Sequence, residues 1–319
     1  MHEFELIKNY FSNISKKNKS ALNLNDDVFF DKKKGIAISV DTYNLGYHFI
    51  DFKKPNLVIK KILRSSISDL ICKGVLPKYY FIAASGNNKT FTKKNLSLIS
   101  KSLRGEQNRY NISLCGGDTT FSNKLSFTIT SLGYTKKIIY RNKALLNDDI
   151  YVTGNLGDSF MGLQILKKKI SVSKKLTSYF VKKYYLPNLQ LKLTKKLLNL
   201  ANSSIDLSDG LIDDLGKMIN NQNLSYTLIE KKIPISNNLL KIIKMKKIKK
   251  IKLVSNGDDY QILFTASKDK SRIIAKTSKN LRIKISKIGK ICSNKKSSMI
   301  VDEKGKELLV KNMGYVHQF

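Results

Sequence analysis

Blocks of apolar and polar residues along the chain predict interleaved strands and helices. Residues 36–40 form a compact apolar run typical of a buried strand, and residues 125–130 alternate apolar and polar side chains, as in a strand with one polar face. Pro55 opens a stretch with apolar residues at helical spacing, and Gly74 closes it. The same patterns predict helices at 4–11 and 211–219, and strands at 112–115, 150–152, 204–207 and 262–264. This mixture favours an α/β (α+β) fold.

The pattern changes character around residues 135–150, where a new series of strands begins. A chain of 319 residues is long enough for two ordinary domains. No linker rich in Pro, Gly or Ser marks the division, and no internal repeat is visible. We therefore predict two mixed α/β domains, 1–139 and 140–319.

The formal net charge of +35 could indicate a nucleic-acid or membrane partner. However, only six of the 59 basic residues are arginines, and the lysines are scattered among many Ile and Asn residues. All three residue types favour A/T-rich codons, so we interpret the charge as compositional and expect no specific nucleic acid. The densest lysine block, 241–252, has isoleucines at roughly helical spacing and predicts one amphipathic helix with a solvated lysine face.

Targeting and redox signals are weak. The longest apolar runs are too short to span a bilayer, and the N-terminus lacks the pattern of a signal peptide. The three cysteines are odd in number and widely spaced, which predicts neither a disulfide framework nor a metal site. We expect a cytoplasmic protein without a membrane partner.

The few acidic residues gather where chemistry is expected. Among only 24 acids, many lie at predicted strand ends or Gly-rich turns: Asp26, Asp27, Asp41, Asp118, Asp206, Asp209, Asp258 and Asp259, with Asp69 inside a predicted helix. Carboxylates in such places suit Mg²⁺, which prefers oxygen ligands and substrate phosphates. The chain has no phosphate-binding P-loop motif and no protein-kinase motifs. An ATP-using enzyme with this sequence would therefore depend on carboxylate-bound magnesium.

The order of the motifs identifies a family. Gly-Gly-Asp-Thr-Thr stands at 116–120, Val-Thr-Gly-Asn-Leu-Gly-Asp-Ser at 152–159, Asp-Leu-Ser-Asp-Gly-Leu at 206–211 and Gly-Asp-Asp-Tyr at 257–260. Together with Glu-Phe-Glu-Leu-Ile at 3–7, Gly-Tyr-His-Phe at 46–49 and the ending Gly-Tyr-Val-His-Gln-Phe, they resemble the thiamine-monophosphate kinase family. That family belongs to the superfamily of aminoimidazole ribonucleotide synthetase and selenophosphate synthetase. The resemblance covers essentially the whole chain.

The resemblance implies several Mg²⁺ ions, ATP as co-substrate, and roles for matching positions. The implied metal ligands are Asp27, Ser39, Val40, Asp41, Asp69, Asp118, Asp206 and Asp209. The implied ATP contacts are Gly117, Asp118, Arg141 and Ser208, and the implied thiamine monophosphate contacts are His48, Asp258 and Tyr315. It also implies a homodimer in which the N-terminal sheets pair, and an α/β sandwich as the C-terminal domain.

The chain departs from the family pattern at some of these positions. Val40 replaces a Thr, so only its backbone carbonyl could bind metal, and Asp258 replaces a Glu, which shortens the contact by one methylene. The resemblance implies direct in-line phosphorylation of thiamine monophosphate to thiamine diphosphate. Two alternatives remain: another ATP-dependent enzyme of the superfamily, or a catalytically weak relative that binds the ligands. Selenophosphate synthetase would need a reactive Cys near its start, whereas the first here is Cys72.

Overall fold

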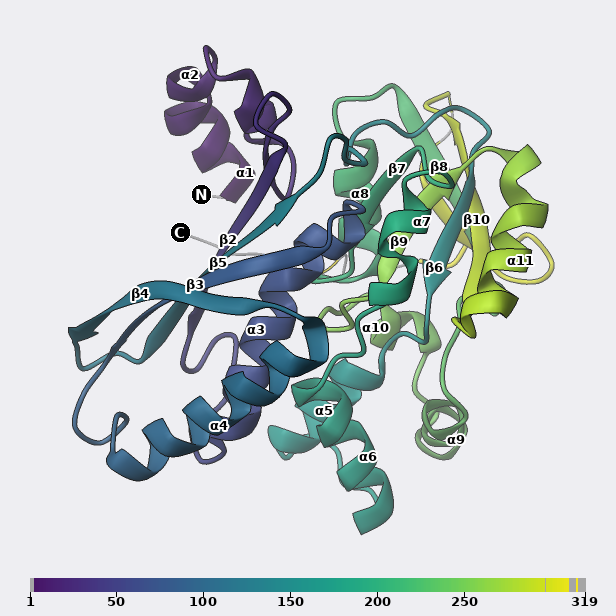
Figure 1. Ribbon diagram of the computed structural model, residues 1–319. Helices are drawn as coiled ribbons and strands as arrows, with labels where there is room; N and C mark the ends of the chain where they lie inside the picture. The colour runs from purple at the N-terminus through teal and green to yellow at the C-terminus, as the bar shows by residue number, and fades with distance from the viewer. Residues whose placement is uncertain (1–2, 296, 310–313, 315–319) are drawn as a thin grey trace.

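The computed structural model describes residues 3–295, 297–309 and 314, and Figure 1 shows two sheets flanked by helices. The five-stranded sheet has the order β1-β2-β5-β3-β4 and the six-stranded sheet the order β11-β8-β10-β6-β9-β7. Strands β1 to β5 lie within residues 29–134, and strands β6 to β11 within residues 149–301. The predicted mixed α/β class is thereby confirmed.

The N-terminal sheet is covered on one face by two long helices. Its strands are β1 (Phe29–Asp31), β2 (Ile36–Asn44), β3 (Pro77–Gly86), β4 (Ser113–Phe121) and β5 (Ser126–Tyr134). Helices α3 (Pro55–Cys72) and α4 (Lys93–Tyr110) pack on each other, and α3 contacts β2 and β5 (Figure 1). Alternate residues of β2, such as Ala37 and Ser39, are buried on this face, as the two-residue period of a strand requires.

The C-terminal sheet has helices on both faces, as predicted for a sandwich. Its strands are β6 (Asp149–Thr153), β7 (Ser203–Asp206), β8 (Leu224–Ile229), β9 (Ile262–Ala266), β10 (Ile285–Ser293) and β11 (Met299–Val301). One face packs Ile150 and Val152 against α8 (Leu211–Ile219). The other face places Tyr151 in a second cluster with Ile274 of α11 (Ser271–Leu281).

Helix α3 joins the two halves of the molecule. It contacts β7, α6 (Lys174–Tyr185) and α7 (Thr194–Leu197), in addition to its own sheet. One hydrophobic cluster therefore contains Ile62 of α3, Tyr184 of α6 and Phe264 of β9. The predicted domain boundary near residue 139 falls in the connection between β5 and β6 and stays a prediction.

Several local expectations needed correction. The stretch 4–11 divides into α1 (Glu3–Leu6) and a π-helical turn at Ile7–Phe11, which is followed by α2 (Ser12–Ser15). The lysine block does not form one helix. It divides into α9 (Asn237–Lys246) and α10 (Lys250–Val254), because Lys247 adopts a left-handed conformation with φ of +51° and ends α9.

Two aspartates expected at strand ends lie inside strands. Asp41 and Asp118 both lie inside longer strands, since hydrogen-bonded pairing continues past each of them. The remaining helix of the described chain, α5 (Asp158–Leu166), packs on α6. Among the residues searched, no helix is both long and apolar enough to cross a membrane.

Candidate active site

Aspartates from four separate segments converge beneath the N-terminal sheet, next to α3. They come from the loop before β1, from β2, from the last turn of α3 and from the end of β7: Asp27, Asp41, Asp69 and Asp206. The Ser39 hydroxyl donates to Asp69 Oδ2 over 2.5 Å, and the Ser68 hydroxyl donates to Asp206 Oδ2. Small polar residues in the last turns of α3 thus make this end of the helix one wall of an acidic site.

The pKa values show that these carboxylates share one environment. Burial raises the pKa of Asp41 to about 6 and that of Asp206 to about 8, and the charge of Asp27 adds to both shifts. Burial, followed by the charges of Asp41 and Asp206, raises the pKa of Asp69 well above its usual value. Carboxylates that resist ionisation because of burial and like charge are those that a cation would stabilise.

The three acids at the centre of this group have no basic partner among the residues that the structure describes. Asp41, Asp69 and Asp206 make no ion pair with any lysine or arginine in the described part of the chain. Asp41 Oδ2 and the nearby Ser66 hydroxyl are buried without a hydrogen-bond partner among the described residues. Unused oxygen ligands beside uncompensated carboxylates fit a hard cation such as Mg²⁺.

Asp27, in contrast, is held by two basic side chains. Lys73 Nζ lies 2.6 Å from Asp27 Oδ2 and 2.9 Å from Asp26 Oδ1, and Arg141 Nη1 lies 2.9 Å from Asp27 Oδ1. Burial would raise the pKa of Asp27, but the charges of Lys73 and Arg141 lower it to about 2. Asp27 is therefore ionised and fixed in place. Arg141, predicted to contact ATP, also bonds to Asn25 and is largely buried.

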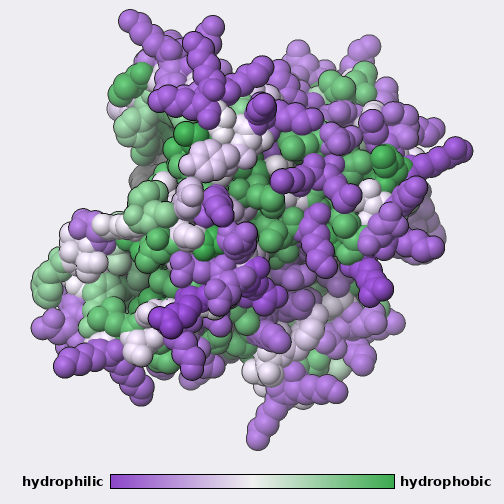
Figure 2. Space-filling view, viewed as in Figure 1, coloured by the Kyte–Doolittle hydropathy of each residue, from purple (hydrophilic) through white to green (hydrophobic). Residues whose placement is uncertain are grey.

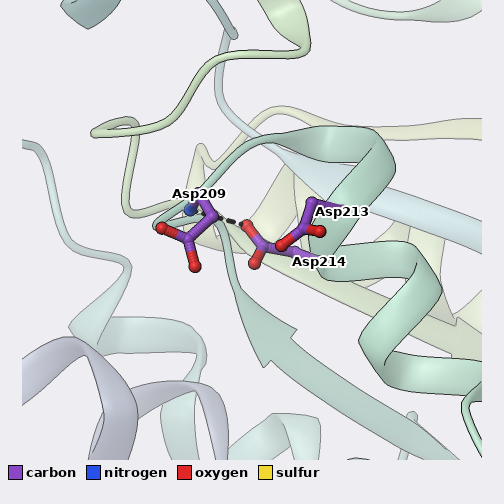
Figure 3. Close-up of side chains that lie close together, drawn as sticks. All are labelled: Asp209, Asp213 and Asp214. Atoms are coloured by element: carbon purple, nitrogen blue, oxygen red, sulfur yellow. Dashed lines mark hydrogen bonds between the residues drawn. The ribbon is translucent and has the colours of Figure 1, made fainter. Parts of the chain in front are cut away.

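A second acidic group surrounds the start of α8 (Figure 3). Carboxylate oxygens of Asp209, Asp213 and Asp214 lie within 4.8 Å of one another. Lys217 is ion-paired with all three, at 2.9 Å from Asp213 and 3.0 Å from Asp214. The charge of Asp214 adds to the raised pKa of Asp206, so the two groups are neighbours. Asp209 was predicted among the metal ligands, but here its charge is already compensated.

Gly117 and Asp118 lie on β4, at the edge of the N-terminal sheet. In the strand register Asp41 lies opposite Ile129, which in turn lies opposite Ile82 of β3. Asp118 lies opposite Ala83, the next residue of β3 after Ile82. Successive positions of a strand point to opposite faces, so Asp118 and Asp41 lie on different faces of the sheet. The single chain does not bring Asp118 into the acidic group, and its metal role stays a prediction. The Val40 side chain is also on the outer face, with 60% of its surface exposed.

Of the residues predicted to contact substrate, Asp258 lies close to the acidic group: burial, and then the charges of Asp258, Asp206 and Asp41, raise the pKa of Tyr260 well above its usual value. The Asp258 carboxylate accepts from Tyr260 over 3.2 Å, and the Asp258 backbone N–H donates to the Ser208 carbonyl. His48 is half-buried in the loop after β2, where its Nδ1 accepts from the Asn44 backbone N–H. Tyr315 lies outside the described residues.

Sequence reasoning missed the basic side chains that complete the site. Three lysines pair with acids in the site or beside it: Lys61, Lys73 and Lys217. The side chains of Lys61 and Lys73 are almost completely buried, and that of Lys217 is largely buried. No local pattern distinguishes them from the dozens of other lysines. Sequence reasoning also missed the role of Asp259, whose Oδ2 accepts the Gly157 N–H over 2.7 Å and caps the start of α5. This bond explains why the Gly-Asp-Asp-Tyr and Val-Thr-Gly motifs lie together.

Comparisons with known proteins agree with this geometry. The family described as AIR synthase related protein, N-terminal domain, matches residues 23–135. The chain is 33% identical to the thiamine-monophosphate kinase of Buchnera aphidicola subsp. Schizaphis graminum over 326 residues, with 99% of this chain and 98% of that protein covered. It is also 33% identical to the thiamine-monophosphate kinase of Escherichia coli (strain K12) over 270 residues, with 82% of each covered. Among solved structures, AaThiL complexed with AMPPCP and TMP is similar, with a TM-score of 0.84, 25% identity, and coverage of 99% of this chain and 97% of that one.

Proposed function

The chain belongs to the thiamine-monophosphate kinase family, and from this membership we propose that it transfers the γ-phosphoryl group of ATP to thiamine monophosphate, making thiamine diphosphate. The structural observation that carries the proposal is the group of Asp41, Asp69 and Asp206, three carboxylates with no basic partner in the described chain. Bringing two phosphorylated substrates together needs positive charge at the point of transfer. The acidic group supplies the ligands for that charge.

Several Mg²⁺ ions are part of this proposal. Their ligands would be Asp27, Asp41, Asp69 and Asp206, with the Ser39 hydroxyl and the Val40 carbonyl. Bound magnesium would neutralise the negative charge of the two substrates' phosphates. Lys73 and Arg141 keep Asp27 ionised, so this ligand is ready at any pH above about 3. We also keep Asp118 and Asp209 as proposed ligands, and Gly117, Arg141 and Ser208 as proposed ATP contacts.

The proposed transfer is direct and needs no general base. The acceptor is a phosphate monoester whose second pKa is about 6, so it is largely deprotonated and nucleophilic at neutral pH. His48, the one histidine within the described residues, bonds to the backbone through Nδ1. ATP made chiral at the γ-phosphorus tests this proposal. One in-line transfer inverts the configuration, whereas a relay through the protein gives retention, which would contradict the direct route.

The activity itself is tested by incubating the protein with ATP, MgCl₂ and thiamine monophosphate and identifying the products. We expect ADP and thiamine diphosphate in equal amounts, and no product when a chelator removes the metal. Tight binding of both substrates without turnover would instead support a ligand-binding relative. Turnover with a different phosphate acceptor would support another activity of the superfamily.

We include a homodimer in the proposal because the N-terminal sheet leaves one face uncovered. Val40, Phe81 and Tyr134 are exposed by 60%, 40% and 58%, and the register places Val40 and Phe81 on the same face through Thr130. A second copy would remove these apolar side chains from water. Sedimentation equilibrium should give twice the chain mass, and Phe81→Lys should shift the protein toward monomer. A monomeric wild type at micromolar concentration would rule this out.

The remaining proposed properties follow from the activity. We propose a cytoplasmic location, where ATP is available, and no nucleic-acid or membrane partner. Hydrophilic side chains spread around the visible face, with apolar side chains between them (Figure 2).

A further inference from the structure

Lys61 is a charged residue buried in the middle of α3. Its relative exposure is 1%, and its ammonium lies 2.5 Å from Asp258 Oδ1 and 3.9 Å from the centre of the Tyr184 ring. A buried ammonium is strongly unfavourable unless it is paired. A carboxylate and an aromatic face, supplied by two different segments of the C-terminal half, therefore hold this one side chain of the N-terminal half.

The loop that carries Asp258 is fixed in an unusual conformation. Asp258 and Tyr260 have φ angles of +71° and +49°, and their N–H groups donate to the carbonyls of Ser208 and Leu207. A Cβ atom at Gly257 would lie only 1.7 Å from the Ser208 carbonyl oxygen, so this position requires glycine. Left-handed conformations of non-glycine residues are unfavourable and occur often at functional sites. The conformation aims the Asp258 carboxylate at Lys61.

The two oxygens of Asp258 have different surroundings. Oδ1 receives both Lys61 and the Tyr260 hydroxyl, whereas Oδ2 has no hydrogen bond or ion pair with any residue the structure describes. The side chain of Asp258 is 24% exposed, although Lys61 behind it is almost fully buried. One oxygen is therefore anchored inside, and the other is available to a ligand.

Lys61 also connects two of the three residues that the family resemblance assigns to substrate, Asp258 and His48. The Tyr184 ring lies against the Lys61 ammonium, and the Tyr184 hydroxyl donates to the His48 carbonyl over 3.1 Å. A single buried cation thus fixes Asp258 directly and reaches the His48 loop through one aromatic ring.

We propose that Lys61 is a positioning residue for substrate recognition: it holds Asp258 so that Oδ2 accepts a hydrogen bond from the amino group of the aminopyrimidine of thiamine monophosphate. This inference rests on the proposed function. The charge of Asp258 is already balanced by Lys61, so its free oxygen suits a neutral N–H donor better than the permanently cationic thiazolium. Sites built for an N–H donor strongly reject analogues that lack it, because the buried acceptor then stays unpaired.

The test compares thiamine monophosphate with oxythiamine monophosphate, in which a carbonyl replaces the amino group. We expect the wild type to prefer thiamine monophosphate at least tenfold in kcat/KM. Lys61→Met should raise the KM for thiamine monophosphate about tenfold, leave the KM for ATP within twofold, and lower the preference over the oxo analogue, because the carboxylate is no longer held. The matched control is Lys60→Met, at the half-buried neighbouring position, which should behave as wild type.

The double variant Lys61→Met with Asp258→Asn separates positioning from folding, because it leaves no unpaired carboxylate. If Lys61 acts through Asp258, the double variant binds thiamine monophosphate no more weakly than Asp258→Asn alone. Additive losses, or equal changes in the KM values of both substrates, would overturn the inference. Wild-type turnover of thiamine monophosphate is measured first, so failure of the proposed function is seen separately from failure of this one.

Discussion

Replacing Lys73 with methionine should destabilise the protein more than almost any other single lysine change. Its ammonium is fully buried, pairs with Asp26 and Asp27 at 2.9 and 2.6 Å, and donates to the Ser204 carbonyl over 2.7 Å. Burial would lower the pKa of Lys73, but the two aspartates raise it above its usual value. Methionine fills similar space but removes the ammonium from both carboxylates, and the ion pair of Arg141 with Asp27 remains.

The expected size of the effect follows from these contacts. Removing one partner of a buried ion pair destabilises a protein by about 3–5 kcal/mol, a large share of the roughly 5–15 kcal/mol that stabilises a typical protein. At about 2 °C per kcal/mol for a large domain, the melting temperature should fall by at least roughly 6 °C. Lys137→Met is the control, because Lys137 is exposed and its ammonium bonds only weakly to Asn199 over 3.4 Å.

Thermal unfolding with and without magnesium checks both the size and the cause. Without the Lys73 ammonium, Asp26 and Asp27 should attract a cation, so Mg²⁺ should raise the melting temperature of Lys73→Met more than that of the wild type. A variant that melts within 2 °C of the wild type would refute the reasoning. A large loss of stability that Mg²⁺ does not reduce would show that packing, rather than charge, was removed.

Three further predictions concern charge in the site. The pKa values of Asp41 and Asp206, raised to about 6 and about 8, give stability that is fully present below about pH 4 and is lost as the pH rises through those values. The melting temperature of the metal-free protein should therefore fall between about pH 4 and 8, and a constant or rising value would contradict the pKa shifts. Asp41→Asn should weaken Mg²⁺ binding measured by calorimetry at least tenfold, whereas Asp209→Asn should change it less, because Lys217 already neutralises Asp209; equal losses would show otherwise. Duplex DNA should bind weakly, with an affinity that collapses as salt rises, and nanomolar sequence-selective binding at physiological salt would show that the lysine excess has a function.

Local patterns were sufficient for much of the fold. Helix α3 begins at Pro55 and ends just before Gly74, as predicted, because proline is favoured at the first turn and glycine just past the last. The strand at 36–40 was also correct in position but too short, since β2 continues to Asn44. Its extension depends on pairing with β5, which lies more than 80 residues further along the chain. Such pairing leaves no local signal.

The same limit applies to the site. The motifs named Asp41, Asp69 and Asp206, and the structure brings them together from three elements. The face on which Asp118 lies follows from the register of β3 and β4, including a shift between Tyr80 and Ile82, which no sequence pattern reveals. The basic partners were invisible for a different reason, because lysine is the commonest kind of charge in this chain.

Those basic partners divide the aspartates into two kinds that look alike in the sequence. Lys73 and Arg141 neutralise the Asp26–Asp27 pair, Lys217 neutralises the group at the start of α8, and Lys61 neutralises Asp258. Each of these acids is paired with a cation of the protein itself. Asp41, Asp69 and Asp206 lie between them with raised pKa values and no such partner among the described residues. Positive charge from outside the chain therefore gains most at these three.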